Sequence, residues 1–200
     1  MYDILIKNGT IVDGSGEKPF KKNLAIKDEK ITLVDGEVDA KRVIDAEGKL
    51  VTPGFIDTHS HSSMLVNVEP YLAPKLFQGI TTELVAQDGM GPAPVDEKNI
   101  KAWTKAMAGL EGEYDFEWKW RSVADYLDEL EKLELGPNIA YLAPHGNIRM
   151  VSMGLDNRKP TEEEQEKMNQ ELQRAFDEGA FGMSTGMIYP PCVYANIDKF

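Results

Sequence analysis

The feature that most constrains the fold is a repeat of apolar strand, loop and amphipathic helix that begins after Pro53-Gly54. Short apolar segments that end in small or polar residues predict strands at residues 54–58, 81–86, 138–142 and 179–184. Strands that alternate with helices in this way are typical of a parallel sheet. The sequence therefore predicts an α/β fold from residue 54 onward.

Two of the intervening helices carry clear start signals. Ser122 with Asp125, and Thr161 with Glu164, form capping-box pairs, in which each side chain satisfies a backbone N–H at the start of a helix. Gly179 follows the second helix and is a natural terminator before the fourth strand.

The first 53 residues have a different pattern. Short segments in which apolar residues tend to alternate with polar ones are separated by turn pairs such as Asn8-Gly9 and Asp35-Gly36. This pattern predicts a small β-sandwich at 1–53, followed by the β/α part at 54–200.

Residues 91–121 form a longer stretch between the second and third predicted strands. It contains all three tryptophans of the chain, Trp103, Trp118 and Trp120. We interpret it as an inserted loop and helical segment that forms a lid or ledge. The alternative, that these rings simply pack on the local helix, carries equal weight.

Composition excludes several classes of partner and site. The chain has 34 acidic and 22 basic residues and a net charge of −12, so its field repels phosphate backbones and anionic lipids. No run of 18 apolar residues is present. The single cysteine, Cys192, permits no internal disulfide, and the first residues lack a signal-peptide pattern. We expect a cytoplasmic protein that binds neither nucleic acid nor membrane.

Two histidines follow the first predicted strand of the β/α part. Residues two apart on a strand share a face, so His59 and His61 are expected to project together from the strand end. Two imidazoles so placed suit zinc and similar metals, although a bare His-x-His also occurs as two ordinary polar histidines. Asp57 could hold a ring N–H, or it could make a buried structural hydrogen bond.

Four segments carry a resemblance to a known family. They are residues 51–61 (VTPGFIDTHSH), 78–82 (QGITT), 141–149 (YLAPHGNIR) and 178–191 (EGAFGMSTGMIYPP). The first resembles the first-strand signature of the amidohydrolase superfamily, and the others resemble its N-acyl-D-amino-acid deacylase branch, the D-aminoacylases. The resemblance implies the first half of a TIM-like (β/α)8 barrel after a β-sandwich module, and zinc-assisted hydrolysis of an N-acyl amino acid.

The resemblance also implies a ligand set. The paired histidines of the family fall on His59 and His61. Its strand-two cysteine lies in an Asn-Cys-Gly setting, where this chain has Gln87-Asp88-Gly89, so Asp88 becomes the third candidate ligand for one or two zinc ions. A carboxylate can replace a thiolate but can change metal preference, and a plain Asp-Gly turn is the alternative. Cys192 lies elsewhere and is expected to be a small packed side chain.

Five further residues are candidates for substrate binding, two of them weaker than the rest. His145 ends the third predicted strand and is expected to face the mouth of the barrel, or to cap that strand. Arg149 could pair with a substrate carboxylate, although a structural ion pair is the commoner role. Tyr189 could wall the pocket or stiffen its loop, and Ser184, like Asn147, is a weaker candidate.

A complete barrel needs eight strand–helix units, and this chain supplies about four. Its three histidines cannot provide the family's later metal ligands, and no general acid or base is assigned within it. We therefore expect an inactive isolated chain whose open sheet is closed by the C-terminal half of the barrel, in the same or a separate polypeptide, or by self-association.

Two other functions stay open at this point. Cyclic-amide hydrolases of the dihydropyrimidinase or dihydroorotase type resemble the chain in the first-strand signature. However, they usually carry a carboxylated lysine on strand four, and residues 179–188 contain no lysine. A catalytically inactive half-barrel that serves as a binding module is the other alternative, and poor zinc retention would indicate it.

Overall fold

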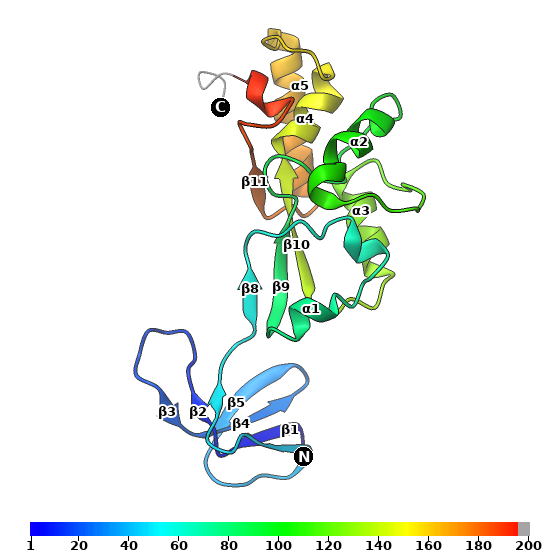
Figure 1. Cartoon of the computed structure of the whole chain (residues 1–200). Coiled ribbons are helices and arrows are strands. Elements are labelled where there is room, and N and C mark those ends of the chain that lie inside the picture. The colour runs from blue at the N-terminus through cyan, green and yellow to red at the C-terminus, as the bar shows by residue number, and fades with distance from the viewer. Residues whose placement is uncertain (196–200) are drawn as a thin grey trace. The chain divides into compact units, whose positions relative to one another are not determined.

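The chain divides into two compact units. The structure, a computed structural model, describes residues 1–195 and separates Met1–Gly54 from the part that begins at Phe55 (Figure 1). Among the described residues, no helix is long and apolar enough to span a membrane. Each unit is described by itself below.

The first unit is built from strands alone. One sheet has the order β5 (Lys30–Val34), β4 (Asn23–Lys27), β1 (Tyr2–Lys7) and β6 (Ala40–Asp45), with only β1 and β6 parallel. The second has the order β3 (Phe20–Lys21), β2 (Thr10–Ile11) and β7 (Leu50–Val51). The buried hydrophobic residues of the whole first unit are few: Leu5, Ile11, Ala25 and Ala46. The all-β prediction agrees with this unit, but a β-sandwich is not clearly shown.

The second unit contains a curled parallel sheet. Its strands are β8 (Phe55–Asp57), β9 (Ile80–Val85), β10 (Asn138–Pro144) and β11 (Gly182–Ser184), and each pairs in parallel with its neighbour along the chain. Consecutive parallel strands joined by helices form a sheet of the kind found in half of a β/α barrel. The α/β prediction is confirmed at this level.

Helices connect these strands. They are η1 (Leu65–Asn67), α1 (Ala73–Leu76), α2 (Ile100–Glu111), α3 (Val123–Glu131), α4 (His145–Met153), α5 (Glu162–Asp177) and η2 (Cys192–Tyr194). Both predicted capping boxes are present: Ser122 accepts a hydrogen bond from the Asp125 N–H at 3.1 Å, and Thr161 accepts one from the Glu164 N–H at 3.2 Å.

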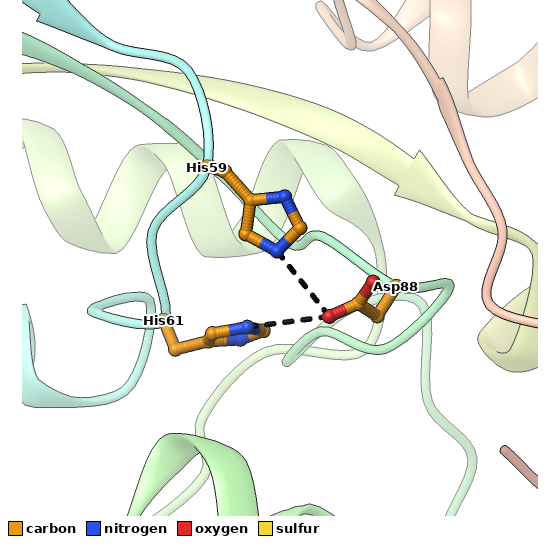
Figure 2. A group of neighbouring side chains, drawn as sticks. All are labelled: His59, His61 and Asp88. Carbon is orange, nitrogen blue, oxygen red and sulfur yellow. Dashed lines mark ion pairs between the residues drawn. The ribbon is translucent and has the colours of Figure 1, made fainter. Parts of the chain in front are cut away.

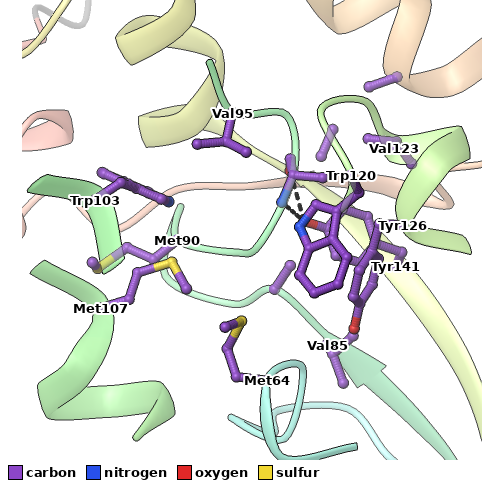
Figure 3. Close-up of a cluster of buried hydrophobic side chains, with 14 of the residues drawn as sticks. Met64, Val85, Met90, Val95, Trp103, Met107, Trp120, Val123, Tyr126 and Tyr141 are labelled. Atoms are coloured by element: carbon purple, nitrogen blue, oxygen red, sulfur yellow. Dashed lines mark hydrogen bonds between the residues drawn. The ribbon is translucent and has the colours of Figure 1, made fainter. Parts of the chain in front are cut away.

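One face of this sheet packs on the helices. Tyr141 of β10 and Tyr126 of α3 are buried together, with ring centroids 5.2 Å apart (Figure 3). The indole N–H groups of Trp103 and Trp120 donate to the carbonyls of Gly91 and Pro92, each at 2.9 Å. These two rings therefore pack within the 91–121 segment and its neighbours, which was the simpler alternative for that segment.

Apolar side chains on the opposite face of the sheet are partly exposed. Ile56, Leu84, Ala140 and Leu142 alternate with the residues that face the helices, and all four are at least partly exposed. No described helix covers this face. Apolar surface exposed in this way is typical of a face that packs against a further structural element.

The α5 cap gives a first test. We expect Thr161→Ala to lower the free energy of unfolding by about 1 kcal/mol, because it removes the acceptor for the Glu164 N–H. Denaturant unfolding measures the change. Thr161→Ser keeps the hydroxyl and should lose much less, and equal losses in the two variants would contradict the capping role.

Candidate metal centre

His59, His61 and Asp88 converge at the carboxyl ends of β8 and β9. Their ligand atoms all lie within 4.8 Å of one another, and the two imidazole centroids are 5.4 Å apart (Figure 2). Strand β8 ends at Asp57, so both histidines extend from the loop after the strand rather than from the strand itself. The rings nevertheless point the same way, toward the Asp88 carboxylate.

The spacing of these atoms suits one divalent cation. The Nε2 atoms of His59 and His61 lie 3.4 and 3.3 Å from Asp88 Oδ2. Ligands held about 2.1 Å from a tetrahedral zinc are separated by about 3.4 Å, so each histidine nitrogen lies at the right separation from the Asp88 oxygen for two ligands of one cation. Two imidazoles and a carboxylate also form a donor set that zinc accepts. The residues present therefore fit the metal that the sequence predicts.

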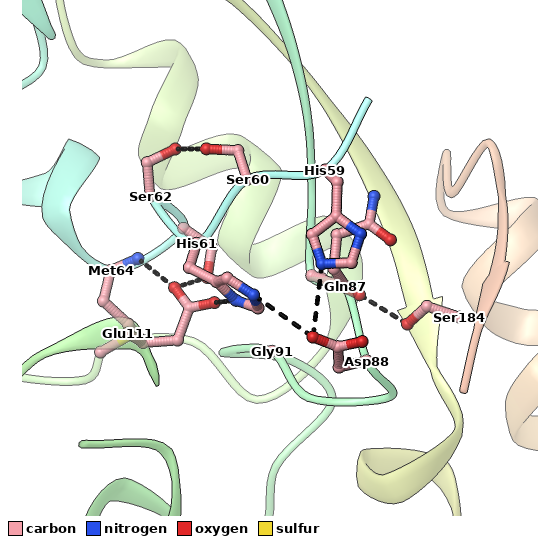
Figure 4. Close-up of polar contacts among 12 residues, drawn as sticks. His59, Ser60, His61, Ser62, Met64, Gln87, Asp88, Gly91, Glu111 and Ser184 are labelled. Atoms are coloured by element: carbon pink, nitrogen blue, oxygen red, sulfur yellow. Dashed lines mark hydrogen bonds and ion pairs between the residues drawn. The ribbon is translucent and has the colours of Figure 1, made fainter. Parts of the chain in front are cut away.

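A tight turn after β9 holds Asp88. Asp88 has a φ of 58°, in the left-handed region that aspartate tolerates better than most residues. The buried Ser184 hydroxyl donates to the Ala86 carbonyl at 2.5 Å and accepts from the Gly89 N–H at 3.1 Å (Figure 4). Ser184 therefore fixes the turn that carries Asp88.

The start of α4 and the loop after β11 both approach the backbone of this turn closely. A Cβ on Gly186, after β11, would lie 2.3 Å from the Asp88 carbonyl oxygen. A Cβ on Gly146, at the start of α4, would lie 2.5 Å from the Gly89 carbonyl oxygen, and its own N–H donates to that oxygen at 2.9 Å. Cys192 is buried against both Gly89 and Gly146, consistent with the expected packed side chain.

A buried glutamate that the sequence analysis did not select supports His61. The Glu111 carboxylate, at the end of α2, faces His61 Nδ1 at 3.2 Å (Figure 4). It also accepts hydrogen bonds from the Ser63 hydroxyl at 2.6 Å and from the Met64 N–H at 3.3 Å. Its position, 50 residues after His61, gave no local signal.

A second polar group holds the other side of the same loop. Lys75 of α1 lies 2.7 Å from both the Asp57 and the Glu83 carboxylates. Glu83 is buried and also accepts from the Ser62 hydroxyl. The hydrogen bond from Lys75 holds the pKa of the Asp57 carboxyl below its usual range. Asp57 accepts the backbone N–H of His59 at 3.2 Å, and not a ring N–H as first considered.

His145 lies just beyond the third strand, as the first residue of α4. It is buried, and its Nδ1 lies 2.9 Å from the Thr185 hydroxyl. Burial, with a smaller effect of the nearby Arg149 charge, lowers its pKa from the ordinary 6.5 to about 4. The ring is therefore neutral at pH 7. It also lines a mainly apolar cavity of about 300 Å³ between α4, α5 and β11.

The remaining candidates make structural contacts. The buried Arg149 guanidinium donates to the carbonyls of Asp156 and Arg158. Asn147 is buried and bonds the backbone of Gly91 through both its amide nitrogen and its oxygen. Tyr189 is half-buried and ends a turn in which its N–H donates to the Gly186 carbonyl at 2.9 Å. None of these contacts among the described residues joins the histidine–aspartate group directly.

Comparison with known proteins identifies a family match. The model of the amidohydrolase family matches residues 42–196, which is more than three quarters of the chain. A D-aminoacylase from Alcaligenes xylosoxydans xylosoxydans is 32% identical over 200 residues, covering 99% of this chain and 40% of that protein. An N-acyl-D-glutamate deacylase from the same organism is 33% identical over 191 residues, covering 94% of this chain and 38% of that protein.

A solved structure is also similar. The N-acyl-D-glutamate deacylase from Bordetella bronchiseptica, complexed with zinc and a phosphonate mimic of the tetrahedral intermediate, superposes with a TM-score of 0.88 at 34% identity. The match covers 99% of this chain and 41% of that one. The chain thus spans about two fifths of the length of these relatives.

The close approach at Gly186 predicts a large effect of one methyl group. We expect Gly186→Ala to destabilise the fold by about 1–3 kcal/mol and to weaken zinc binding, because the Cβ would displace the Asp88 backbone. Denaturant unfolding and zinc titration measure the two effects. Gly109→Ala is the matched control: nothing lies within 4 Å of its Cβ, and alanine in helix α2 should stabilise by about 0.5–1 kcal/mol. A Gly186→Ala protein as stable as wild type would contradict the packing described.

The buried His145 predicts a pH dependence of stability. The unfolded chain binds the proton at the ordinary pKa of 6.5 and the folded chain only near pH 4, so stability falls as the pH falls through this window. Wild type should lose more stability between pH 7 and pH 4.5 than His145→Gln, in which the carboxylates still titrate. Equal losses in denaturant unfolding would show that the ring is not held neutral.

Proposed function

The chain is a member of the amidohydrolase family, and on this premise we propose that it is the metal-binding N-terminal part of a D-aminoacylase-like hydrolase. The proposed reaction is hydrolysis of the amide bond of an N-acyl-D-amino acid, which releases a carboxylate and the D-amino acid. The relatives named for this activity, and their similarity over nearly the whole chain, support the proposal.

The observation that carries the proposal is the convergence of His59, His61 and Asp88 on one point. We propose that these three residues hold zinc, as one or two ions. When bound, such a cation polarises an amide carbonyl and lowers the pKa of a bound water. The histidines hold the cation through Nε2, and Asp88 supplies a negatively charged oxygen where the relatives' branch has a thiolate.

The proposed substrate-binding residues differ in their contacts and therefore in their proposed roles. His145 is neutral at pH 7, so its ring can exchange hydrogen bonds with a polar substrate group without carrying charge. Arg149, Ser184 and Tyr189 are proposed to shape the rim of the site: Arg149 orders the loop after α4, and Ser184 holds the turn of Asp88.

The rest of the catalytic machinery is proposed to lie in the part of the barrel that these residues do not supply. No general acid or base is assigned to the described residues, and the open apolar face at Ile56, Leu84 and Leu142 supports closure by further strands. We propose that this face is covered by the C-terminal half of the barrel, in the same or a separate polypeptide, or by self-association, and that the isolated 200-residue chain is inactive. The division at residue 53, the insert at 91–121 and a cytoplasmic location stay predictions.

The experiment that tests the function uses the full-length protein. Matched N-acyl-D- and N-acyl-L-amino acids are offered, and we expect release of the D-amino acid only. His59→Ala and His61→Ala should each reduce kcat/KM at least about 10³-fold and lower the bound zinc, since the displaced metal provides the main polarising charge.

The matched control is Glu17→Gln, an exposed acidic residue of the first unit. It should keep both zinc and activity. Wild-type protein that hydrolyses neither enantiomer, or histidine variants that keep full activity and zinc content, would contradict the proposal.

A further inference from the structure

Among residues 1–195, Glu111 is the buried carboxylate in direct contact with a side chain proposed as a metal ligand. Its side chain is 0% exposed, whereas the His61 side chain is 25% exposed and opens toward Asp88. It reaches His61 from the far end of α2, within the 91–121 insert. Burying a carboxylate costs free energy unless hydrogen-bond donors surround it, so the partners of Glu111 indicate its role.

The hydrogen bonds divide between its two oxygens. Oε2 accepts from the Ser63 hydroxyl and the Met64 N–H, and these contacts tie down the loop. Oε1 faces His61 Nδ1 at 3.2 Å. An ionised carboxylate oxygen can only accept, so with Glu111 ionised the proton between them is carried by Nδ1.

A proton on Nδ1 determines the chemistry of the other ring nitrogen. In a neutral imidazole with Nδ1 protonated, Nε2 carries the free lone pair. That atom lies 3.3 Å from Asp88 Oδ2, on the side where His59 Nε2 also points. Carboxylates that accept the second N–H of a ligating histidine fix its tautomer and ring orientation in many metal sites.

We propose that Glu111 is a positioning residue: it holds the Nδ1 proton of His61 and thereby presents the Nε2 lone pair to a divalent cation shared with His59 and Asp88. The 91–121 segment then contributes to the metal centre, because its residue Glu111 contacts His61 at Nδ1, the ring nitrogen that does not face Asp88. This inference rests on the proposed metal site and adds a function for a residue outside the ligand set.

The simpler role for Glu111 is structural, as an anchor for the loop through Oε2. The two roles separate experimentally because Tyr126 anchors the same loop without touching His61: its hydroxyl donates to the Ser63 carbonyl at 2.6 Å. Tyr126→Phe removes that bond, while Asn67 continues to donate to the same carbonyl at 3.1 Å. Tyr126→Phe therefore weakens the anchoring of the loop without removing a contact to His61, and it serves as the control for Glu111→Gln.

The first measurement needs no variant. In the full-length, zinc-loaded protein with ¹⁵N-labelled histidine, NMR should show His61 coordinated through Nε2 and a hydrogen-bonded, slowly exchanging proton on Nδ1. Coordination of His61 through Nδ1 would overturn the proposal. This readout decides the matter even where a Glu111 variant fails to fold.

The second measurement is zinc affinity, by competition with a chelator. Glu111→Gln should weaken zinc binding about 10- to 100-fold and shift or remove the Nδ1 proton signal. Tyr126→Phe and Glu113→Gln, the latter an exposed residue, should keep both near wild type. An unchanged affinity in Glu111→Gln, or an equal loss in Tyr126→Phe, would overturn the positioning role alone. A wild-type protein without zinc affinity would overturn the proposed metal site as well.

Discussion

The site depends on the anchoring of one short loop, the segment 59–64 that carries both histidines. Three carboxylates hold it: Asp57 through the His59 N–H, Glu83 through Ser62, and Glu111 through Ser63 and His61. Two of these carboxylates are buried, where unmatched charge is costly, so each is tied to the donors of this loop. The loop therefore keeps the orientation in which both imidazoles face Asp88.

The second half of the site is fixed by packing rather than by charge. The turn of Asp88 lies against the backbones of Gly146 and Gly186, where no side chain fits, and Ser184 bonds it from β11. Its position thus depends on β10 and β11 as well as on β9. Strands β10 and β11 carry none of the three candidate ligands, but these contacts let them determine where Asp88 lies relative to the two histidines.

Local patterns were sufficient for much of the fold, and the family resemblance supplied the candidate ligands. Apolar periodicity and capping residues placed the strands and the starts of α3 and α5, because those signals lie within a few residues of the element they determine. The motif around His59 and His61, with Asp88, identified residues that the structure brings together. Glu111 was missed because its contact with His61 links residues 50 apart. The hydrogen bonds of Ser184 to the Asp88 turn likewise join residues about a hundred positions apart, so no local pattern in the sequence indicates them.

The central claim is that these three side chains form one metal site, and a crystal structure of the zinc-soaked full-length protein tests it most directly. Anomalous scattering at the zinc edge should show a peak about 2.0–2.2 Å from the Nε2 atoms of His59 and His61 and from a carboxylate oxygen of Asp88. A zinc peak bound elsewhere, with both imidazoles unliganded, would contradict the account.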